Sequence, residues 1–158
     1  MALRMRSPLP SLEGVATWFN GEPAPADLHG RPVIVHFWSL SCYICHNTVD
    51  QVNAWRDRYS PRGAVFISVH QPRSEAELDS AAVERDARDE MKMTQPCAVD
   101  NEHAIVERFG NQFVPGFYVF NRRHELRHFQ AGDKGYERIE LAIERVVAES
   151  GEEDLAPE

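Results

Sequence analysis

The sequence has few cysteines, no long apolar run and a deficit of positive charge. Only three cysteines occur in 158 residues, an odd number that is too small for a disulfide scaffold. No stretch approaches the roughly 18 apolar residues of a transmembrane helix, and no apolar run of signal-peptide length lies near the first residue. Lys and Arg number 17 against 25 Asp and Glu. This balance argues against nucleic acid and anionic membranes as partners, and we expect a cytoplasmic protein.

Length and composition fit one globular domain over residues 1–158, with its core between about residues 8 and 148. Hydrophobic residues make up 42% of the chain and charged residues 27%, as in ordinary soluble domains. Residues 1–31 contain several Pro and Gly and little periodicity. They are expected to form an irregular N-terminal extension with one short strand around Gly14–Trp18.

From residue 33 onwards, apolar β-branched runs alternate with segments of helical periodicity. The run Val33–Trp38 is almost unbroken, which is typical of a strand buried on both faces of a parallel sheet. The expected strands are 33–38, 64–69, 97–99, 117–120 and 126–130. The expected helices are the segment after Ser41 up to Tyr59, residues 74–91, residues 102–109 and the segment after Asp133. This order predicts an α/β fold with a central mixed sheet, flanking helices and a closing antiparallel hairpin.

Three of the expected helices begin with recognisable capping residues. Ser74 and Glu77 have the spacing of a capping box, in which each side chain binds a free amide of the other residue. Asp100 and Asp133 are placed to cap the two helices that follow them. The charged run 84–90 is interpreted as a solvated helix face.

Two of the three cysteines form a Cys-x-x-Cys motif, Cys42-Tyr43-Ile44-Cys45, where a buried strand passes into a helix. Free amides and the helix dipole at a helix start favour a thiolate at Cys42. Such sites lower the pKa of a thiol from about 8.5 to roughly 3.5–7.5. We therefore expect Cys42 to be the exposed attacking thiol and Cys45 the buried resolving thiol.

Other interpretations of the motif remain open. The pair could be two inert buried cysteines, or half of a zinc site, although no second pair of ligands at finger spacing is present. With His46 the motif also matches the attachment pattern for c-type haem, which is formed outside the cytosol. We predict neither a metal nor another cofactor. Cys97 is interpreted as a buried structural thiol, and His46 as an exposed residue whose charge could tune Cys42.

Several segments together resemble the thioredoxin superfamily, specifically its ResA/TlpA-like branch. They are His36 to Cys45, Val69 to Glu75, Val114 to Phe120 and Arg127 to Gly132, and the similarity covers about residues 8 to 148. The resemblance implies a thioredoxin fold. The chain departs from the family at two positions. Ser41, instead of Trp, precedes the first cysteine. The active-site glutamate of the ResA-type proteins is missing, and Arg73 lies near its position in the sequence.

The resemblance also implies further site residues. Pro115 corresponds to the family's cis-proline, which faces the cysteine pair and presents the backbone of Val114 to a substrate strand. Trp38 is expected to pack under the site or border the substrate groove, and we group it with Val114 and Pro115 as substrate-binding. His36 falls where many thioredoxins carry a buried acid, and it could accept the proton of Cys45.

These observations favour a protein-disulfide reductase. It would act on disulfide-containing proteins through Cys42 and be recycled by an upstream thiol reductant, as a monomer. The alternative is a thioredoxin-like binding module whose cysteines sense redox state. A peroxidase of the same superfamily is disfavoured, because the Pro-x-x-x-Thr-x-x-Cys arrangement is missing.

Overall fold

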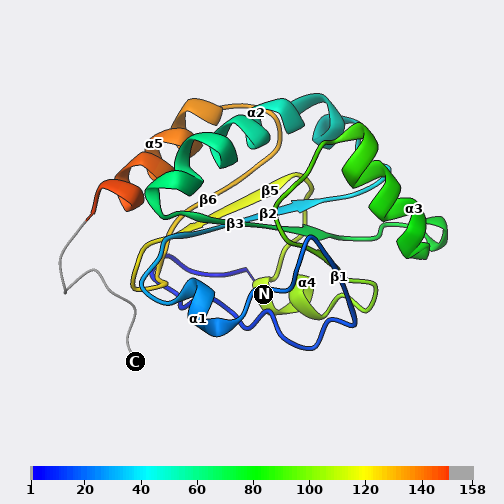
Figure 1. The fold of residues 1–158 in the computed structure, drawn as a ribbon, viewed down its shortest axis with the longest axis horizontal. Helices are drawn as coiled ribbons and strands as arrows, with labels where there is room; N and C mark the ends of the chain where they lie inside the picture. Colours follow the sequence, from blue (N-terminus) through cyan, green and yellow to red (C-terminus); the bar gives the residue numbers. More distant parts are fainter. Residues whose placement is uncertain (1, 150–158) are drawn as a thin grey trace.

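The computed structural model describes residues 2–149, which form one six-stranded sheet with helices on both faces (Figure 1). The strands are β1 (Thr17–Phe19), β2 (Val33–Trp38), β3 (Val65–His70), β4 (Cys97–Val99), β5 (Gly116–Phe120) and β6 (Leu126–Ala131). The α-helices are α1 (Pro25–Leu28), α2 (Tyr43–Tyr59), α3 (Ser80–Arg85), α4 (Ala104–Phe109) and α5 (Tyr136–Ala148). Three shorter helical segments are η1 (Ser60–Arg62), η2 (Glu75–Leu78) and η3 (Asp86–Glu90).

The sheet has the order β1-β4-β3-β2-β5-β6. Strands β2, β3 and β4 run parallel, while β1, β5 and β6 pair antiparallel with their neighbours. The parallel centre and the closing hairpin confirm the mixed sheet that the element order predicted. Residues 17–19 form the extra strand of the N-terminal extension, three residues further along the chain than the expected start.

The helices divide the core between the two faces of the sheet. Helices α2 and α5 lie side by side over one face, and α1 and α4 lie on the other side (Figure 1). Alternate residues of β2 serve the two faces: Ile34 packs with the side chains of α2 and α5, whereas Val35 and Phe37 pack with those of α4. The unbroken apolar run of β2 is therefore explained by burial on both sides.

Helix α2 is long enough to carry the site at one end and a core face along its whole length. Its buried residues are Cys45, Val49, Val52, Trp55 and Tyr59, the apolar series expected from the sequence. Their spacing of three or four residues keeps them on one side of the helix, so the buried stripe aligns the helix on the sheet. The first turn is held in place by this stripe.

The segment 74–91 differs from its prediction as a single capped helix. It divides into the 3-10 turn η2, the α-helix α3 and the π-helix η3. Asp79, rather than Ser74, caps α3 by accepting hydrogen bonds from the amides of Ala81 and Ala82. The prediction of a capping box is wrong, because the carboxylate of Glu77 points into the protein interior and accepts hydrogen bonds from Ser41.

Two further caps differ in detail. Asp100 lies outside α4, but its carboxylate accepts hydrogen bonds from the amides of Ile105 and Val106 at 3.2 and 2.8 Å. It satisfies free amides of the first turn, as predicted, from a more distant position. Helix α5 begins after Gly135 with no side-chain cap, so the expected capping by Asp133 is wrong. Gly135 has a φ of 71°, a conformation that glycine adopts without steric cost.

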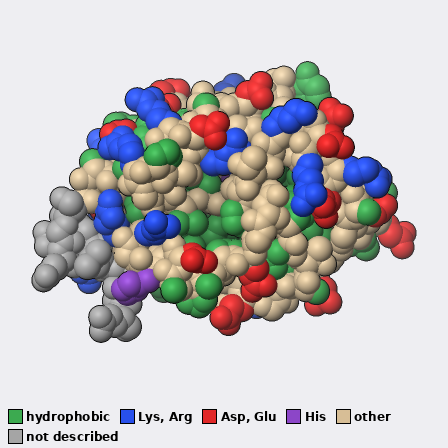
Figure 2. All heavy atoms as spheres, viewed as in Figure 1, with side chains coloured by type: hydrophobic (Ala, Val, Ile, Leu, Met, Phe, Trp, Pro, Cys, Tyr) green, Lys and Arg blue, Asp and Glu red, His purple; other side chains and the backbone are tan. Residues whose placement is uncertain are grey.

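Acidic and basic side chains are interspersed over the face seen in Figure 2. No helix among residues 2–149 combines the length and apolar character needed to span a membrane.

The contact between the sheet and α2 and α5 can be tested at Phe117, which is fully buried. Its ring meets Trp55 and Tyr136 edge-on at centroid distances of 5.9 and 5.3 Å. Because the surrounding aromatic rings cannot collapse into the space, Phe117→Ala should lower the free energy of unfolding by about 3–5 kcal/mol. The measurement is urea unfolding. Leu141→Ala, on the exposed face of α5, is the control and should change it by less than about 0.5 kcal/mol.

Candidate active site

The cysteine pair lies where β2 ends and α2 begins. Cys42 and Cys45 form a disulfide with their Cα atoms 5.2 Å apart. Cys42 is also the N-cap of α2, and its Sγ accepts a hydrogen bond from the amide of Cys45 at 3.0 Å. In the reduced protein the same amide, together with the positive end of the helix dipole, would stabilise a thiolate at Cys42.

The burial of the pair corrects one expectation. Cys42 is only 4% exposed and Cys45 0%, so in the disulfide form Cys42 is not an exposed sulfur. The residues between them are the exposed ones, with Tyr43 at 79% and Ile44 at 36%. Because Tyr43 and Ile44 lie outside the buried stripe of α2 that begins at Cys45, they form an apolar rim beside the disulfide.

A second loop completes the site. The Val114–Pro115 peptide bond is cis, as the resemblance implied. Val114 packs against the buried cluster that contains both cysteines, and Pro115 is itself buried. The ladder between β5 and β2 begins at the pair Gly116–Phe37, so Val114 lies just beyond its end. Phe113, which precedes Val114, is 62% exposed.

Trp38 occupies a different place from the one we assigned. Its side chain is completely buried, in the same cluster as the two cysteines and in edge contact with the ring of His70. It therefore packs under the site, and its assignment to the substrate-binding surface is corrected. The reason is the alternation of β2, which directs Trp38 to the face covered by α2.

His36 lies on the α2 side of the sheet and is buried. Its ring stacks on Phe117 with centroids 4.9 Å apart, and neither ring nitrogen has a hydrogen-bond partner among residues 2–149. Burial lowers the pKa of His36 from 6.5 to about 3, so the ring is neutral at physiological pH. Its role as proton acceptor for Cys45 stays a prediction, and this weak basicity counts against it.

Sequence reasoning missed Glu77, which is buried next to the loop before Cys42. Its carboxylate accepts hydrogen bonds from the amide and hydroxyl of Ser41, at 3.2 and 2.9 Å, and from the amide of Arg73 at 3.1 Å. Burial acts to raise the pKa of Glu77, but these hydrogen bonds and the neighbouring His70 outweigh it and hold the pKa below its ordinary value. The guanidinium of Arg73 in turn donates to the Ser41 hydroxyl.

His46 is less exposed than expected because it is held between two partners. Its Nδ1 lies 2.7 Å from the carbonyl oxygen of Cys42, and its Nε2 lies 2.6 Å from Oδ2 of Asp86. Asp86 begins the π-helix η3, which corrects the interpretation of 84–90 as a purely solvated face.

Cys97 lies in the same buried cluster as the cysteine pair. Burial raises the pKa of its thiol to about 12, so it stays protonated and unreactive at physiological pH. This environment supports its interpretation as a structural thiol. Across residues 2–149, no three His, Cys, Asp or Glu side chains are grouped in a way that could hold a metal ion.

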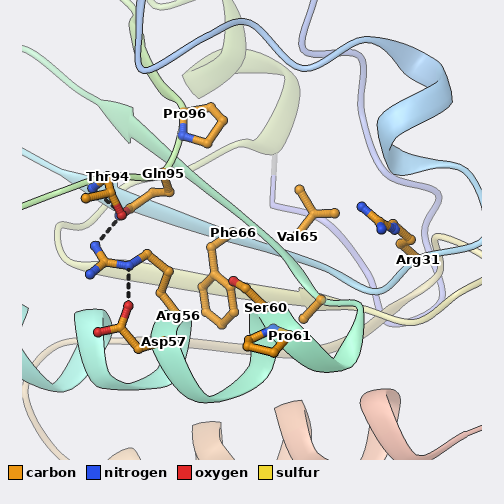
Figure 3. A pocket seen from close by; sticks show the side chains of 11 residues that line it. Arg31, Arg56, Asp57, Ser60, Pro61, Val65, Phe66, Thr94, Gln95 and Pro96 are labelled. Atoms are coloured by element: carbon orange, nitrogen blue, oxygen red, sulfur yellow. Dashed lines mark hydrogen bonds and ion pairs between the residues drawn. The ribbon is translucent and has the colours of Figure 1, made fainter.

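Two cavities of the structure lie away from the cysteines. One cavity of about 480 Å³ lies at the far end of α2, about 25 Å along that helix from Cys42. Figure 3 shows Arg56, one of the two arginines that line it, paired with Asp57 and hydrogen-bonded to Gln95. Another, of about 620 Å³, lies between residues 9–13 and α1. Neither is lined by a cysteine, so cavity size does not locate this site.

A Cys-x-x-Cys pair that heads a helix at the carboxyl end of a central strand, in a mixed sheet of this order and in one cluster with the residue before a cis-proline, defines a thioredoxin-like protein. The model of the AhpC/TSA family matches residues 10–129, and the chain belongs to this thioredoxin-like family. The chain is also 42% identical to the thiol-disulfide oxidoreductase YkuV of Bacillus subtilis over 149 residues, which cover 94% of this chain and 99% of that protein.

Solved structures agree with this assignment. A solution structure of a thioredoxin-like protein in the oxidised form has a TM-score of 0.83 and 41% identity, covering 94% of this chain and all of that one. A thiol-disulfide isomerase from Corynebacterium glutamicum has a TM-score of 0.77 at 21% identity, covering 90% of this chain and 98% of that one, and shows the fold alone. The predicted thioredoxin fold is confirmed.

The buried His36 gives a testable pH dependence of stability. Its pKa is about 3 in the folded protein against 6.5 for an exposed ring, so between these values the unfolded chain binds more protons. The free energy of unfolding therefore falls as the pH drops below 6.5. In His36→Phe, which keeps a ring against Phe117, the fall between pH 7 and pH 5 should be smaller by about 2 kcal/mol. Urea unfolding at both pH values measures this, and equal falls in the two proteins would contradict it.

Proposed function

We propose that this protein is a thiol–disulfide oxidoreductase that reduces disulfides in protein substrates by dithiol exchange through Cys42 and Cys45. The observation that carries the proposal is the disulfide itself, which spans the start of α2 and lies in one buried cluster with Val114, the residue before the cis-proline. The 42% identity to YkuV, a thiol-disulfide oxidoreductase, supports the same chemistry.

The exchange begins from the reduced protein. The Cys42 thiolate attacks one sulfur of the substrate disulfide, forms a mixed disulfide and releases the other substrate sulfur as a thiolate, which takes up a proton. The Cys45 thiol then loses its proton and attacks Sγ of Cys42, which re-forms the Cys42–Cys45 disulfide and releases the second substrate thiol. The substrate gains two electrons and two protons, and an upstream thiol reductant restores the protein by the reverse exchange.

The geometry supports these two roles for the cysteines. Sγ of Cys42 accepts the Cys45 amide and caps α2, so a negative charge is best stabilised there. The same stabilisation makes Cys42 a good leaving group in the reverse exchange, when a second thiol of the upstream reductant attacks the reductant sulfur that is bound to Cys42. Cys45 is completely buried directly beneath, where it meets Cys42 but is shielded from other disulfides.

The surroundings support a protein as substrate. Tyr43 and Ile44 are large, apolar and exposed between the two cysteines, and Phe113, which precedes Val114, is exposed as well. A small-molecule disulfide needs no such apolar surface. Val114 lies beyond the last pair of the β5 ladder, where its backbone could pair with an extended substrate segment. Pairing through the main chain depends little on the side chains of the substrate, which favours broad specificity. We further propose that the protein acts in the cytoplasm as a monomer, where a reducing environment favours reduction over oxidation.

The proposal predicts that a resolving-cysteine variant will trap substrate. Pre-reduced Cys45→Ser protein mixed with insulin should accumulate a mixed disulfide through Cys42, because the second step is blocked, whereas Cys42→Ser should form none. Mass spectrometry before and after dithiothreitol measures the adduct, and the wild-type protein should reduce insulin completely.

Two outcomes would contradict this prediction. Equal adducts with both variants would show that Cys42 is not the attacking thiol. Absence of any adduct, with wild-type protein that leaves insulin oxidised, would reject the reductase. In that case a change of partner affinity between the oxidised and reduced forms would favour the redox-sensing binding module.

A further inference from the structure

We propose that Gln71 and Asn111 are positioning residues that couple the loop before Cys42 (residues 39–41) to the loop that contains the cis Val114–Pro115 bond. They would thereby set the spacing of these two loops, which a protein substrate must contact together. The inference rests on the proposed reductase function and adds a specificity device to it. Neither residue touches the disulfide, and both act through the loops that they hold.

Gln71 follows β3 and is bound to the cysteine loop through its backbone. Its amide donates to the carbonyl oxygen of Trp38 at 2.8 Å, and its carbonyl oxygen accepts from the hydroxyl of Ser39 at 2.5 Å. The carbonyl oxygen of Ser39 then accepts from the amide of Cys42 at 3.0 Å. The backbone of Gln71 is thus two hydrogen bonds away from the attacking cysteine.

The side chain of Gln71 is bound to the opposite loop. Its Oε1 accepts a hydrogen bond from Nδ2 of Asn111 at 2.7 Å, and the same Nδ2 donates to the carbonyl oxygen of Phe113 at 3.0 Å. Phe113 directly precedes the cis Val114–Pro115 bond. A single amide group therefore joins the end of β3 to the segment that presents Val114.

Asn111 is itself fixed on every side. It is 6% exposed, and its Oδ1 accepts from the hydroxyl of Tyr118 at 2.9 Å. Gly116 lies so close that a Cβ at this position would be 2.7 Å from Oδ1 of Asn111 and 3.0 Å from the carbonyl oxygen of Phe113. The glycine is needed here for close approach, because any side chain would displace the amide.

This arrangement affects two kinds of disulfide differently. A small aromatic disulfide needs only access to the sulfur of Cys42, so its reduction does not depend on the spacing of the two loops. An extended protein segment must reach Cys42 and the Val114 backbone at the same time. Since a misplacement of about 1 Å can cost about 100-fold in rate, loosening the coupling should penalise protein substrates selectively.

The test compares two substrates in a single turnover. Pre-reduced wild-type, Gln71→Ala, Asn111→Ala and double-variant proteins are mixed with insulin and, separately, with 5,5′-dithiobis(2-nitrobenzoate), and the second-order rate constants are measured. Gln71→Ala keeps the backbone hydrogen bonds to Trp38 and Ser39 and removes only the link to Asn111. Asn121→Ala is the matched control, because Asn121 is equally buried but lies at the other end of β5. Urea unfolding checks that each variant is folded.

Each single variant should lower the insulin rate about tenfold and change the small-disulfide rate by less than about twofold. The double variant should be no slower than the worse single variant, because the two side chains form one connection. Asn121→Ala should leave both rates unchanged. Equal losses on both substrates, no loss on insulin, or multiplied losses in the double variant would overturn the coupling while leaving the reductase intact. If the wild-type protein reduces neither substrate, the proposed function fails and the inference fails with it.

Discussion

The feature on which the whole site depends is the passage from β2 into α2. A strand buried on both faces fixes the last residue before the loop, and the buried stripe of α2 fixes the first turn after it. Between them the chain turns so that the amide of Cys45 is directed at Sγ of Cys42. The pKa of a thiol is lowered where backbone amides without another partner point at its sulfur. In this protein, the packing of β2 and α2 in the core, far from the sulfur, determines that position.

The loop before Cys42 is held as firmly as the helix after it. Ser39, Leu40 and Ser41 each bind a residue at or beyond the carboxyl end of β3: Ser39 binds Gln71, Leu40 binds His70 and Ser41 binds Glu77. The family usually has an aromatic residue before the first cysteine, whereas Ser41 offers a hydroxyl that bridges Glu77 and Arg73.

Much of the fold could be predicted because its signals are local. A few neighbouring residues are enough to predict the apolar run of β2, the buried stripe of α2 and the hairpin of β5 and β6. The Cys-x-x-Cys motif likewise indicates where its helix begins. The errors lie where local rules compete with tertiary contacts. Glu77 has the spacing of a capping-box residue, but the amide and hydroxyl of Ser41, 36 residues earlier, are better partners. Sequence spacing contains no information on that choice.

The same limit explains the burial of Trp38 and the pairing of His46. Alternation along β2 predicts which side Trp38 faces, but not that α2 and the segment before β4 close over it. The side chain of His46 is bound to Asp86, which lies 40 residues further along the chain in a π-helical turn. No local sequence pattern predicted that turn. The cysteine pair that we propose to carry the chemistry was thus visible in the sequence, whereas the contacts that position it were not.

The charges around the disulfide show how this positioning affects the chemistry. Burial lowers the pKa of His36 to about 3 and of His70 to about 4, and raises that of Cys97 to about 12, so all three are uncharged at neutral pH. Glu77 is buried but stays ionised, because the amides of Ser41 and Arg73 and the Ser41 hydroxyl bind its carboxylate. A thiolate at Cys42 would therefore be favoured by the amide of Cys45 at the helix start and opposed by the negative charge of Glu77. The guanidinium of Arg73, which donates to the Ser41 hydroxyl, lies on the same network as that carboxylate and offsets part of its negative charge.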